Sequence, residues 1–466
     1  MDYPYDQKNE ESIESYGKRL KGSTLRKTKG VKEIPEKYLV YDQTKRTKGV
    51  FGYILERYYY GIKPDNTVSE PDFKEIRVEL KSTPIKKLKS GNFSAKERLV
   101  LNLINYKTEG KKDFFSSSFM NKNRNIMLVG YLHDAERGVV DFLIKIAEMI
   151  KYDEFTEKDR QIIRKDWEKI INKIRAGKAH ELSEGDTFYL GACTKSVNSD
   201  IRRDQLGDAP SAKPRAYSFK SGFMTYLIRG LMDVESVVKE PEEFSKDKSL
   251  EDIITERFEP YLGKTIEEIH SIVGNGLNKN SKSYFAMLAN RMLGVKMKKI
   301  EEFEKANVKM KTIRVKKSGM PKEDMSFPHF KFIDIIEEKW DADEEFGESP
   351  ARVRQFLEQK FFFVVYECEK KCDKSETKIL KKVMFWNMPQ LDIENHVRKV
   401  WAETKRRIKE GRADDLPKKS DDPVCHIRPH GRNKQDVLPT PKNGEVTKQS
   451  FWLDKKYIKK VISKIK

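Results

Sequence analysis

Apolar residues at helical spacing recur in two widely separated stretches of the chain. The repeated positions are Ile163, Trp167, Ile170, Ile171 and Ile174 in the first stretch and Val397, Val400, Trp401, Thr404 and Ile408 in the second. Spacings of three and four residues place these side chains on one face of an α-helix. Gly177 and Gly411 follow the two stretches, at the position where a helix C-cap favours glycine. The pattern therefore predicts one amphipathic helix in each half of the chain.

Residues 75–81 alternate between apolar and charged positions. One face would carry Ile76, Val78 and Leu80, and the other Arg77, Glu79 and Lys81. A period of two is that of a β-strand with one buried face. Such a strand would direct Glu79 and Lys81 into the same cleft.

A damaged copy of this motif returns at residues 302–311. Phe303, Val308 and Lys311 repeat Phe73, Val78 and Lys81, whereas Glu79 is replaced by Lys309. Four more pairs of segments recur in the same order: 48–51 with 282–285, 56–57 with 290–291, 190–198 with 424–430, and 216–220 with 450–455. Repeated landmarks in one order indicate an internal duplication.

The predicted boundary between the copies is the charged stretch 239–248, which lacks apolar periodicity. The sequence thus predicts one domain over residues 1–240 and a second over residues 241–466. Each half mixes helical and strand patterns, so each is expected to be an α/β or α+β domain of about 200 residues.

Two carboxylates in the intact copy favour a divalent metal site. Asp72, at the entrance of the predicted strand, can reach the same point as Glu79, and converging carboxylates suit a hard cation such as Mg²⁺. The Leu80 carbonyl is a further oxygen donor. Lys81 would orient water and offset negative charge beside the attacked phosphate. Glu56, on the flank of a predicted helix, could hold a second metal ion, or the first through water. The alternative interpretation is a surface ion pair on an amphipathic strand.

The second copy lacks this acidic set. Asn290 replaces Glu56, Glu302 replaces Asp72, and Lys309 would share one strand face with Lys311. Two ammonium groups would repel Mg²⁺ and attract phosphate. We therefore expect the second half to have lost cleavage and kept DNA binding.

Composition narrows the class of partner. The 466 residues include 94 Lys and Arg against 74 Asp and Glu, which gives a net charge of +20. A basic excess of this size favours a polyanionic partner, with nucleic acid first. A basic protein without such a partner is the alternative.

No apolar run is long enough to span a bilayer and the N-terminus is polar, so a cytoplasmic protein without membrane attachment is expected. The chain has four cysteines, which makes a disulfide framework unexpected in a reducing compartment. Isolated thiols are the main expectation. A zinc site from Cys368, Cys372, Cys425 and His426 is the alternative, and its Cys-x3-Cys spacing is loose.

These motifs resemble the MutH-like branch of the PD-(D/E)xK nucleases, and the whole chain resembles the Sau-type, GATC-cutting type IIE restriction endonucleases. The matching segments are 48–49, 56–57, 70–73, 78–81, 94–102, 177–185 and 428–429. The resemblance implies an α/β fold with a mixed sheet flanked by helices, present as two tandem MutH-like domains of which the second is catalytically degenerate. It also implies Mg²⁺-dependent cleavage of double-stranded DNA at 5′-GATC to give 5′-phosphate ends. A second GATC copy would bind the C-terminal domain as an allosteric effector.

By position, the resemblance assigns the catalytic roles to Asp72, Glu79 and Lys81, with Glu56 as an auxiliary acid. The base-reading loop has the form Arg-Pro in the repair branch of the family. That form is found here as Arg428-Pro429, whereas the first half has Thr194-Lys195. Arginine or lysine on such a loop suits guanine O6 and N7 in the major groove. The expected DNA-binding residues are Lys48, Gly49, Lys122, Thr194, Lys195 and Tyr217 in the first half and Lys309, Lys311, Arg428, Pro429 and Trp452 in the second.

Two other functions fit parts of the sequence. One is a mismatch-repair nicking enzyme with a duplicated domain, and the other is a non-catalytic DNA-binding regulator. The intact acids of the first half argue against the regulator, because a pure binder has no need of clustered carboxylates facing phosphate. A restriction enzyme would also work beside a DNA methyltransferase, and dimerisation on DNA is a further expectation.

Overall fold

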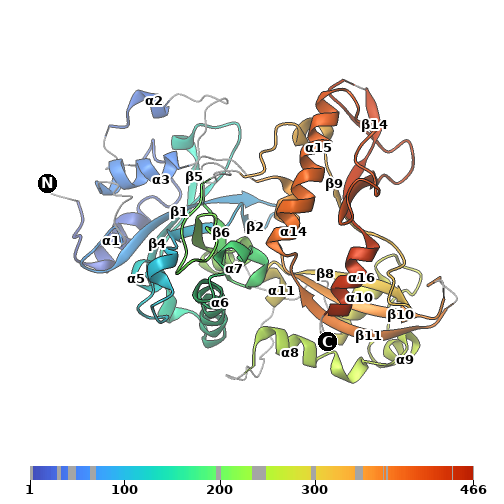
Figure 1. Ribbon diagram of the computed structural model, residues 1–466. Coiled ribbons are helices and arrows are strands. Elements are labelled where there is room, and N and C mark those ends of the chain that lie inside the picture. The colour runs from blue at the N-terminus through green and yellow to red at the C-terminus, as the bar shows by residue number, and fades with distance from the viewer. Residues whose placement is uncertain are drawn as a thin grey trace.

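The computed structural model describes residues 4–28, 33–39, 49–62, 70–195, 201–232, 248–294, 301–341, 350–370, 372–373, 376–442 and 444–464. The two halves of the chain lie side by side, the first in blue and green on the left of Figure 1 and the second in yellow to red on the right. Each half combines sheets with flanking helices, which confirms the prediction of a mixed α/β fold.

The first half contains a four-stranded sheet in the order β2-β1-β4-β5 and a three-stranded sheet in the order β3-β7-β6. The strands are β1 (Val78–Lys87), β2 (Phe93–Ala95), β3 (Leu99–Leu103), β4 (Asn125–Leu132), β5 (Leu143–Lys151), β6 (Leu190–Thr194) and β7 (Arg215–Phe219). β1 is parallel to β4 and antiparallel to β2, and β4 is antiparallel to β5. The larger sheet is therefore mixed.

The amphipathic helix predicted around Trp167 is α6 (Glu157–Arg175). It begins after Thr156, whose side chain accepts a hydrogen bond from the Asp159 N–H, and Gly177 beyond its end has a φ of 69°. The other helices are α1 (Glu10–Lys18), α2 (Glu36–Leu39), α3 (Val50–Ile54), the π-helix η1 (Leu55–Tyr60), α4 (Tyr106–Glu109), α5 (Ser118–Asn123) and α7 (Ser221–Leu231), with short 3₁₀ turns η2 (Val139–Asp141), η3 (Tyr152–Glu154), η4 (Ala179–Glu181) and η5 (Glu184–Asp186).

The second half has one sheet in the order β11-β10-β8, another in the order β12-β15-β9, and the hairpin β13-β14. The strands are β8 (Lys309–Lys316), β9 (Met325–His329), β10 (Phe361–Cys368), β11 (Lys378–Trp386), β12 (Cys425–Pro429), β13 (Val437–Pro439), β14 (Glu445–Thr447) and β15 (Gln449–Leu453). The helices are α8 (Leu250–Glu256), η6 (Glu259–Tyr261), α9 (Ile266–Val273), α10 (Tyr284–Met292), α11 (Glu301–Lys305), α12 (Phe332–Ile335), α13 (Arg352–Leu357), α14 (Gln390–Asp392), η8 (Ile393–Val397), α15 (Arg398–Lys409) and α16 (Lys455–Lys464). α15, continuous with η8, is the second predicted amphipathic helix.

Three strands of the larger sheet in the first half have counterparts of the same order and direction in the second half. β8 is parallel to β10, and β10 is antiparallel to β11, as β1, β4 and β5 are related in the first half. Near the start of each parallel ladder, Glu79 pairs with Ile126 and Lys309 pairs with Phe361. The position of the acid in β1 is thus the position of the lysine in β8.

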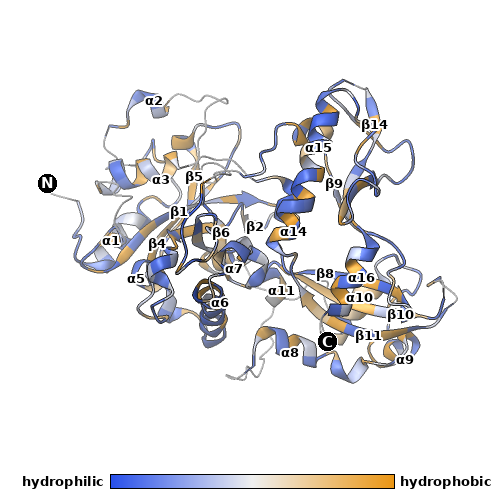
Figure 2. Cartoon of the chain, in the orientation of Figure 1, coloured by the Kyte–Doolittle hydropathy of each residue, from blue (hydrophilic) through white to orange (hydrophobic). Residues whose placement is uncertain are grey.

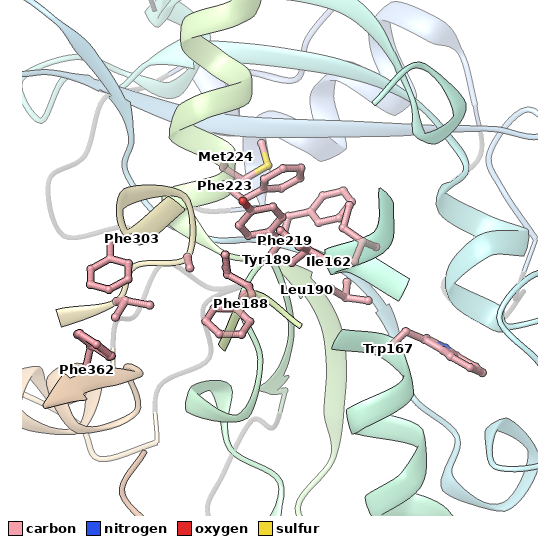
Figure 3. Packing of buried hydrophobic residues seen from close by; sticks show 14 of the residues in the cluster. Ile162, Trp167, Phe188, Tyr189, Leu190, Phe219, Phe223, Met224, Phe303 and Phe362 are labelled. Atoms are coloured by element: carbon pink, nitrogen blue, oxygen red, sulfur yellow. The ribbon is translucent and has the colours of Figure 1, made fainter. Parts of the chain in front are cut away.

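The hydrophobic core runs from one half into the other. One face of β4, with Met127 and Val129, packs with α1, α3 and η1, while the opposite face joins a cluster that includes α6, β6 and β7. That cluster continues into β10 and the helices α8–α10 of the second half. Figure 3 shows Phe303 and Phe362 of the second half near Phe188 of the first. Figure 2 shows hydrophobic residues along β8 and β10 and mainly hydrophilic residues on the visible side of α6.

The cysteines depart from the expectation of isolated thiols. Cys368 and Cys372 are joined as a disulfide, because the end of β10 and the residues after it bring the two side chains together. Cys193 and Cys425 are buried free thiols. A zinc site that shares these cysteines is thereby ruled out, since two of its four ligands are bonded to each other. Among the described residues, no helix has the length and apolar character needed to cross a membrane.

Candidate active site

A tight turn before β1 brings the two predicted carboxylates together. Phe73 and Val78 exchange both backbone hydrogen bonds, at 2.9 and 3.2 Å, and Arg77 between them has a φ of 54°. The expected strand at residues 75–77 is therefore wrong, since the strand begins at Val78. The turn places the Asp72 N–H 3.3 Å from Glu79 Oε2, to which it donates a hydrogen bond.

A hydrogen bond to Asp72 and two ion pairs to Glu79 fix the orientation of the acids. The Leu80 N–H donates to Asp72 Oδ2 at 2.8 Å. Glu79 is 2% exposed, and Lys81 Nζ lies 2.7 Å from its Oε1. Lys122, from α5, places its Nζ 3.5 Å from the same oxygen. The alternation of β1 thus sets Glu79 and Lys81 on one side of the sheet, as the sequence predicts.

The pKa values of the acids are shifted by this crowding. Burial, and then the Asp72 carboxylate, raise the pKa of Glu56 to about 7. Burial, and then the Glu79 carboxylate, raise the pKa of Asp72 to about 6. Burial acts to lower the pKa of Lys81, but Glu79 outweighs it and the net shift is upward. Lys81 therefore stays a cation, and the pKa values of Glu56 and Asp72 stay raised because burial and their carboxylate neighbours outweigh the attraction of the lysines.

The donor set fits a hard cation. Glu56 on η1, Asp72 in the turn and Glu79 on β1 act on one another electrostatically. Within the described residues, no three metal-binding side chains are already gathered around one point. Lys81 provides positive charge at Glu79 Oε1. A divalent ion between Asp72 and Glu79 would supply the missing positive charge and favour the ionised carboxylates.

The corresponding position in the second half has a different chemistry. Lys311 Nζ donates to the Ser326 carbonyl at 3.0 Å and lies 5.3 Å from the centre of the Phe327 ring. Burial lowers the pKa of Lys311. Asn290 and the exposed Lys309 line a cavity of about 890 Å³ between the two halves. The second set therefore presents the Lys309 ammonium group where the first presents the Glu79 carboxylate, and Asn290 where the first has Glu56.

The residues of the first half that are expected to contact DNA are partly buried. Gly49 precedes α3 with a φ of 80°, and Lys48 lies outside the described residues. Thr194 and Lys195 are half-buried at the end of β6. The prediction that Tyr217 contacts DNA is wrong for this structure. Its ring is fully buried in the core, and its Oη lies 3.4 Å from Glu109 Oε1.

The predicted reading residues of the second half lie together on the surface. The Arg428 side chain is 51% exposed, and its guanidinium lies 5.0 Å from the centre of the Trp452 ring. Pro429 beside it is exposed. Asp324 Oδ2 accepts a hydrogen bond from Arg428 Nη1 at 2.9 Å and holds the guanidinium over the ring. No spacing or motif marked Asp324, because its partner is distant in sequence.

Comparison with known protein families defines the class of protein to which the first half belongs. The family model described as DNA mismatch repair enzyme MutH matches residues 60–166. Those residues contain Asp72, Glu79, Lys81 and Lys122, so the chain contains a MutH-type nuclease domain in its first half.

A similarity that extends over most of the chain defines a narrower family than the MutH match does. The type II restriction enzyme Sau3AI of Staphylococcus aureus is 37% identical over 470 residues, which cover 90% of this chain and 94% of the relative. The chain belongs to this family of type II restriction enzymes and is a nuclease. The non-catalytic regulator considered from the sequence is therefore wrong.

Proposed function

We propose that this nuclease cleaves both strands of DNA at 5′-GATC by Mg²⁺-dependent hydrolysis and leaves 5′-phosphate ends. The observation that carries the proposal is the cluster of Asp72, Lys81 and Lys122 around the buried carboxylate of Glu79. The likeness to a type II restriction enzyme along both halves supports double-strand cleavage over nicking.

Each residue has a distinct part in the proposed reaction. Asp72 and Glu79 would hold the ion, with the Leu80 carbonyl as a further donor and Glu56 as an auxiliary acid. Bound there, Mg²⁺ would supply Lewis-acid polarisation of the scissile phosphate. Lys81 orients the attacking water and balances negative charge as the phosphate is attacked. Lys122 adds a second positive charge on the same side.

The second half, residues 241–466, is proposed to bind a further GATC copy as an allosteric effector. The exposed Arg428, beside the half-buried Trp452, supports a DNA contact, and Lys309 in place of an acid supports the loss of cleavage. The proposed boundary with the catalytic half at residues 1–240 falls outside the described residues. Dimerisation on DNA and a partner methyltransferase for the same site complete the proposal.

Cleavage of plasmid DNA tests the catalytic assignment. The wild-type protein with Mg²⁺ should give ends that begin with 5′-phosphorylated GATC, read by sequencing. Asp72→Asn and Glu79→Gln should each lower the rate by about 10³-fold or more, while gel shifts show DNA binding within a few-fold of wild type. Near-normal cleavage by either variant would remove the active-site assignment.

The effector role needs a separate experiment. Substitution of Arg428 by Ala should slow cutting of a two-site plasmid by about tenfold, a coupling in the usual range for allosteric sites. Arg406→Ala on α15, whose side chain is 53% exposed, is the matched control. An uncleavable GATC duplex added at low concentration should stimulate cutting of a one-site plasmid. Equal rates on one-site and two-site plasmids, together with normal cutting by the Arg428 variant, would leave the second half without an effector role.

A further inference from the structure

Two residues that flank the loop expected to read DNA bases in the first half, Thr194 and Lys213, are bonded to the second half. We call the stretch from Thr194 to Lys213 the reading segment. Thr194 is the last residue of β6, and Lys213 precedes β7, the strand that pairs with β6. Thr194 Oγ1 accepts a hydrogen bond from Arg354 Nη2 at 3.0 Å. Lys213 Nζ lies 3.0 Å from Asp341 Oδ1 and 3.0 Å from Glu394 Oε1. Arg354, Asp341 and Glu394 all belong to the second half.

These contacts are nearly closed to solvent. The side chains of Arg354 and Asp341 are 2% and 4% exposed, and that of Lys213 is 12% exposed. Arg354 also pairs with Glu358 through its Nε at 2.8 Å and with Asp341 through its Nη1. Arg398 Nη1 lies 3.3 Å from Glu394 Oε2, so three cations face three carboxylates in this cluster.

The cluster remains charged near neutral pH. Burial acts to raise the pKa of Asp341, but Arg354 and then Lys213 outweigh it and lower that pKa. The pKa of Glu394 is lowered in the same way, with burial opposed first by Lys213. Removing one partner would leave a buried charge uncompensated, so the segment cannot leave the cluster without a large free-energy cost.

The backbone carries this anchorage to the reading residues. The Lys195 N–H donates to the Pro214 carbonyl at 2.9 Å, directly after Lys213. Tyr106 Oη donates to the Lys213 carbonyl at 2.6 Å. A shift of Lys213 would therefore move the backbone of Lys195.

The equivalent segment of the second half is fixed within its own hairpin. Lys448 pairs with Asp436, and Thr447 Oγ1 donates to the Lys434 carbonyl at 3.0 Å. There the exposed Arg428 stands at the end of β12, where Thr194 ends β6. Among the described residues, the buried ion cluster that joins the two halves at Lys213 has no counterpart at Lys448, which pairs with Asp436 of its own half.

We propose that Lys213 is a positioning residue for site recognition, and that the second half sets the placement of Thr194 and Lys195 through Asp341, Glu394 and Arg354. This inference rests on the proposed role of Thr194 and Lys195 in reading DNA. It gives the second half a direct structural route to the catalytic half: whatever displaces α13 or η8 displaces the reading segment.

Lys213→Met in the full-length protein tests this role. The matched control is Lys305→Met, because Lys305 Nζ makes a similarly buried ion pair across the same interface, 3.3 Å from Asp159 Oδ1, away from the reading segment. Both variants remove a buried cation from an ion pair across the interface, so both should lower the melting temperature. The measured quantity is the ratio of kcat/KM on the preferred duplex to kcat/KM on a duplex with one changed base pair.

Lys213→Met should lower this ratio about tenfold, mainly through a higher KM on the preferred duplex, whereas Lys305→Met should leave it within twofold of wild type. Lys213→Arg, which keeps the charge, should restore most of the ratio. An unchanged ratio in Lys213→Met, or an equal fall in the control, would overturn the proposal. The preferred duplex is read from the ends that the wild-type protein makes, so an error in the GATC assignment would show separately.

Discussion

Glu79 and Lys309 lie near the start of the parallel strand pairs β1–β4 and β8–β10, and their surroundings differ as much as their charges do. Glu79 is buried beneath Lys81 and Lys122, close to two other acids. Lys309 is exposed at the edge of a cavity. A carboxylate held in this way can share a metal ion, whereas an exposed ammonium group can only attract an anion.

The raised pKa of Glu56 predicts an unusual pH dependence for the metal-free protein. The pKa of Glu56 is about 7 in the folded protein and near 4.5 in the unfolded protein. Between these two pH values, Glu56 is therefore protonated in the folded state and ionised in the unfolded state. Stability should therefore fall as pH rises from about 5 to 7, by on the order of 1–2 kcal/mol. Urea unfolding in chelator at several pH values measures this.

Glu56→Gln is the control for that titration, because the amide cannot lose a proton. Its stability should fall less over the same pH range, and adding Mg²⁺ should stabilise the wild type more at pH 8 than at pH 6, since protonated carboxyls do not ligate. A pH dependence identical in both proteins would show that Glu56 titrates normally.

At the scale of elements, the turn between residues 73 and 78 creates the site. The turn closes because Arg77 adopts a left-handed backbone conformation, with a φ of 54°. In the second half, Asn307 adopts the same conformation at the same φ. Asparagine tolerates that region better than other non-glycine residues, whereas arginine is strained there. The second half, which has Lys309 in place of Glu79, thus carries the less strained turn.

Exchange of these two residues should reveal the strain. Arg77→Asn should raise the free energy of unfolding by about 0.5–1 kcal/mol, and Asn307→Arg should lower it by a similar amount. Chemical denaturation measures both. Lys74→Asn, in the same turn at negative φ, is the control and should have little effect. A loss of stability in Arg77→Asn would mean that contacts of the arginine outweigh its backbone strain.

At the scale of the whole molecule, the continuous core couples the halves. Phe188 and Phe385 meet edge to face at 5.7 Å, and a Cβ on Gly222 would overlap the Glu304 carbonyl, so α7 and α11 are in close contact. Separate folding of either half would expose this apolar surface. The two halves should therefore unfold as one cooperative unit.

Calorimetry should accordingly show a single unfolding transition. Phe303→Ala should lower stability by about 3–5 kcal/mol and also reduce hydrogen-exchange protection in α6 of the other half. Phe451→Ala, in the separate core cluster of the second half, should reduce α6 protection less. Two resolved transitions, or unchanged α6 protection in Phe303→Ala, would contradict this coupling.

The sequence by itself determined the features that depend on local spacing and order. The helical period around Trp167 and Trp401 predicted α6 and α15, and the spacing of Asp72, Glu79 and Lys81 predicted a site that the structure brings together. Periodicity and motif order can be read from the sequence because each helix or strand is built from residues that are neighbours in the chain.

Only the tertiary structure decided which residues from distant segments meet. It buried Tyr217, joined Cys368 to Cys372 and placed Asp324 beside Arg428. It also brought Lys213 to Asp341 across the interface. These pairings leave no spacing signal in the chain, because they depend on how sheets and helices pack, and packing is set by the shape and burial of whole faces.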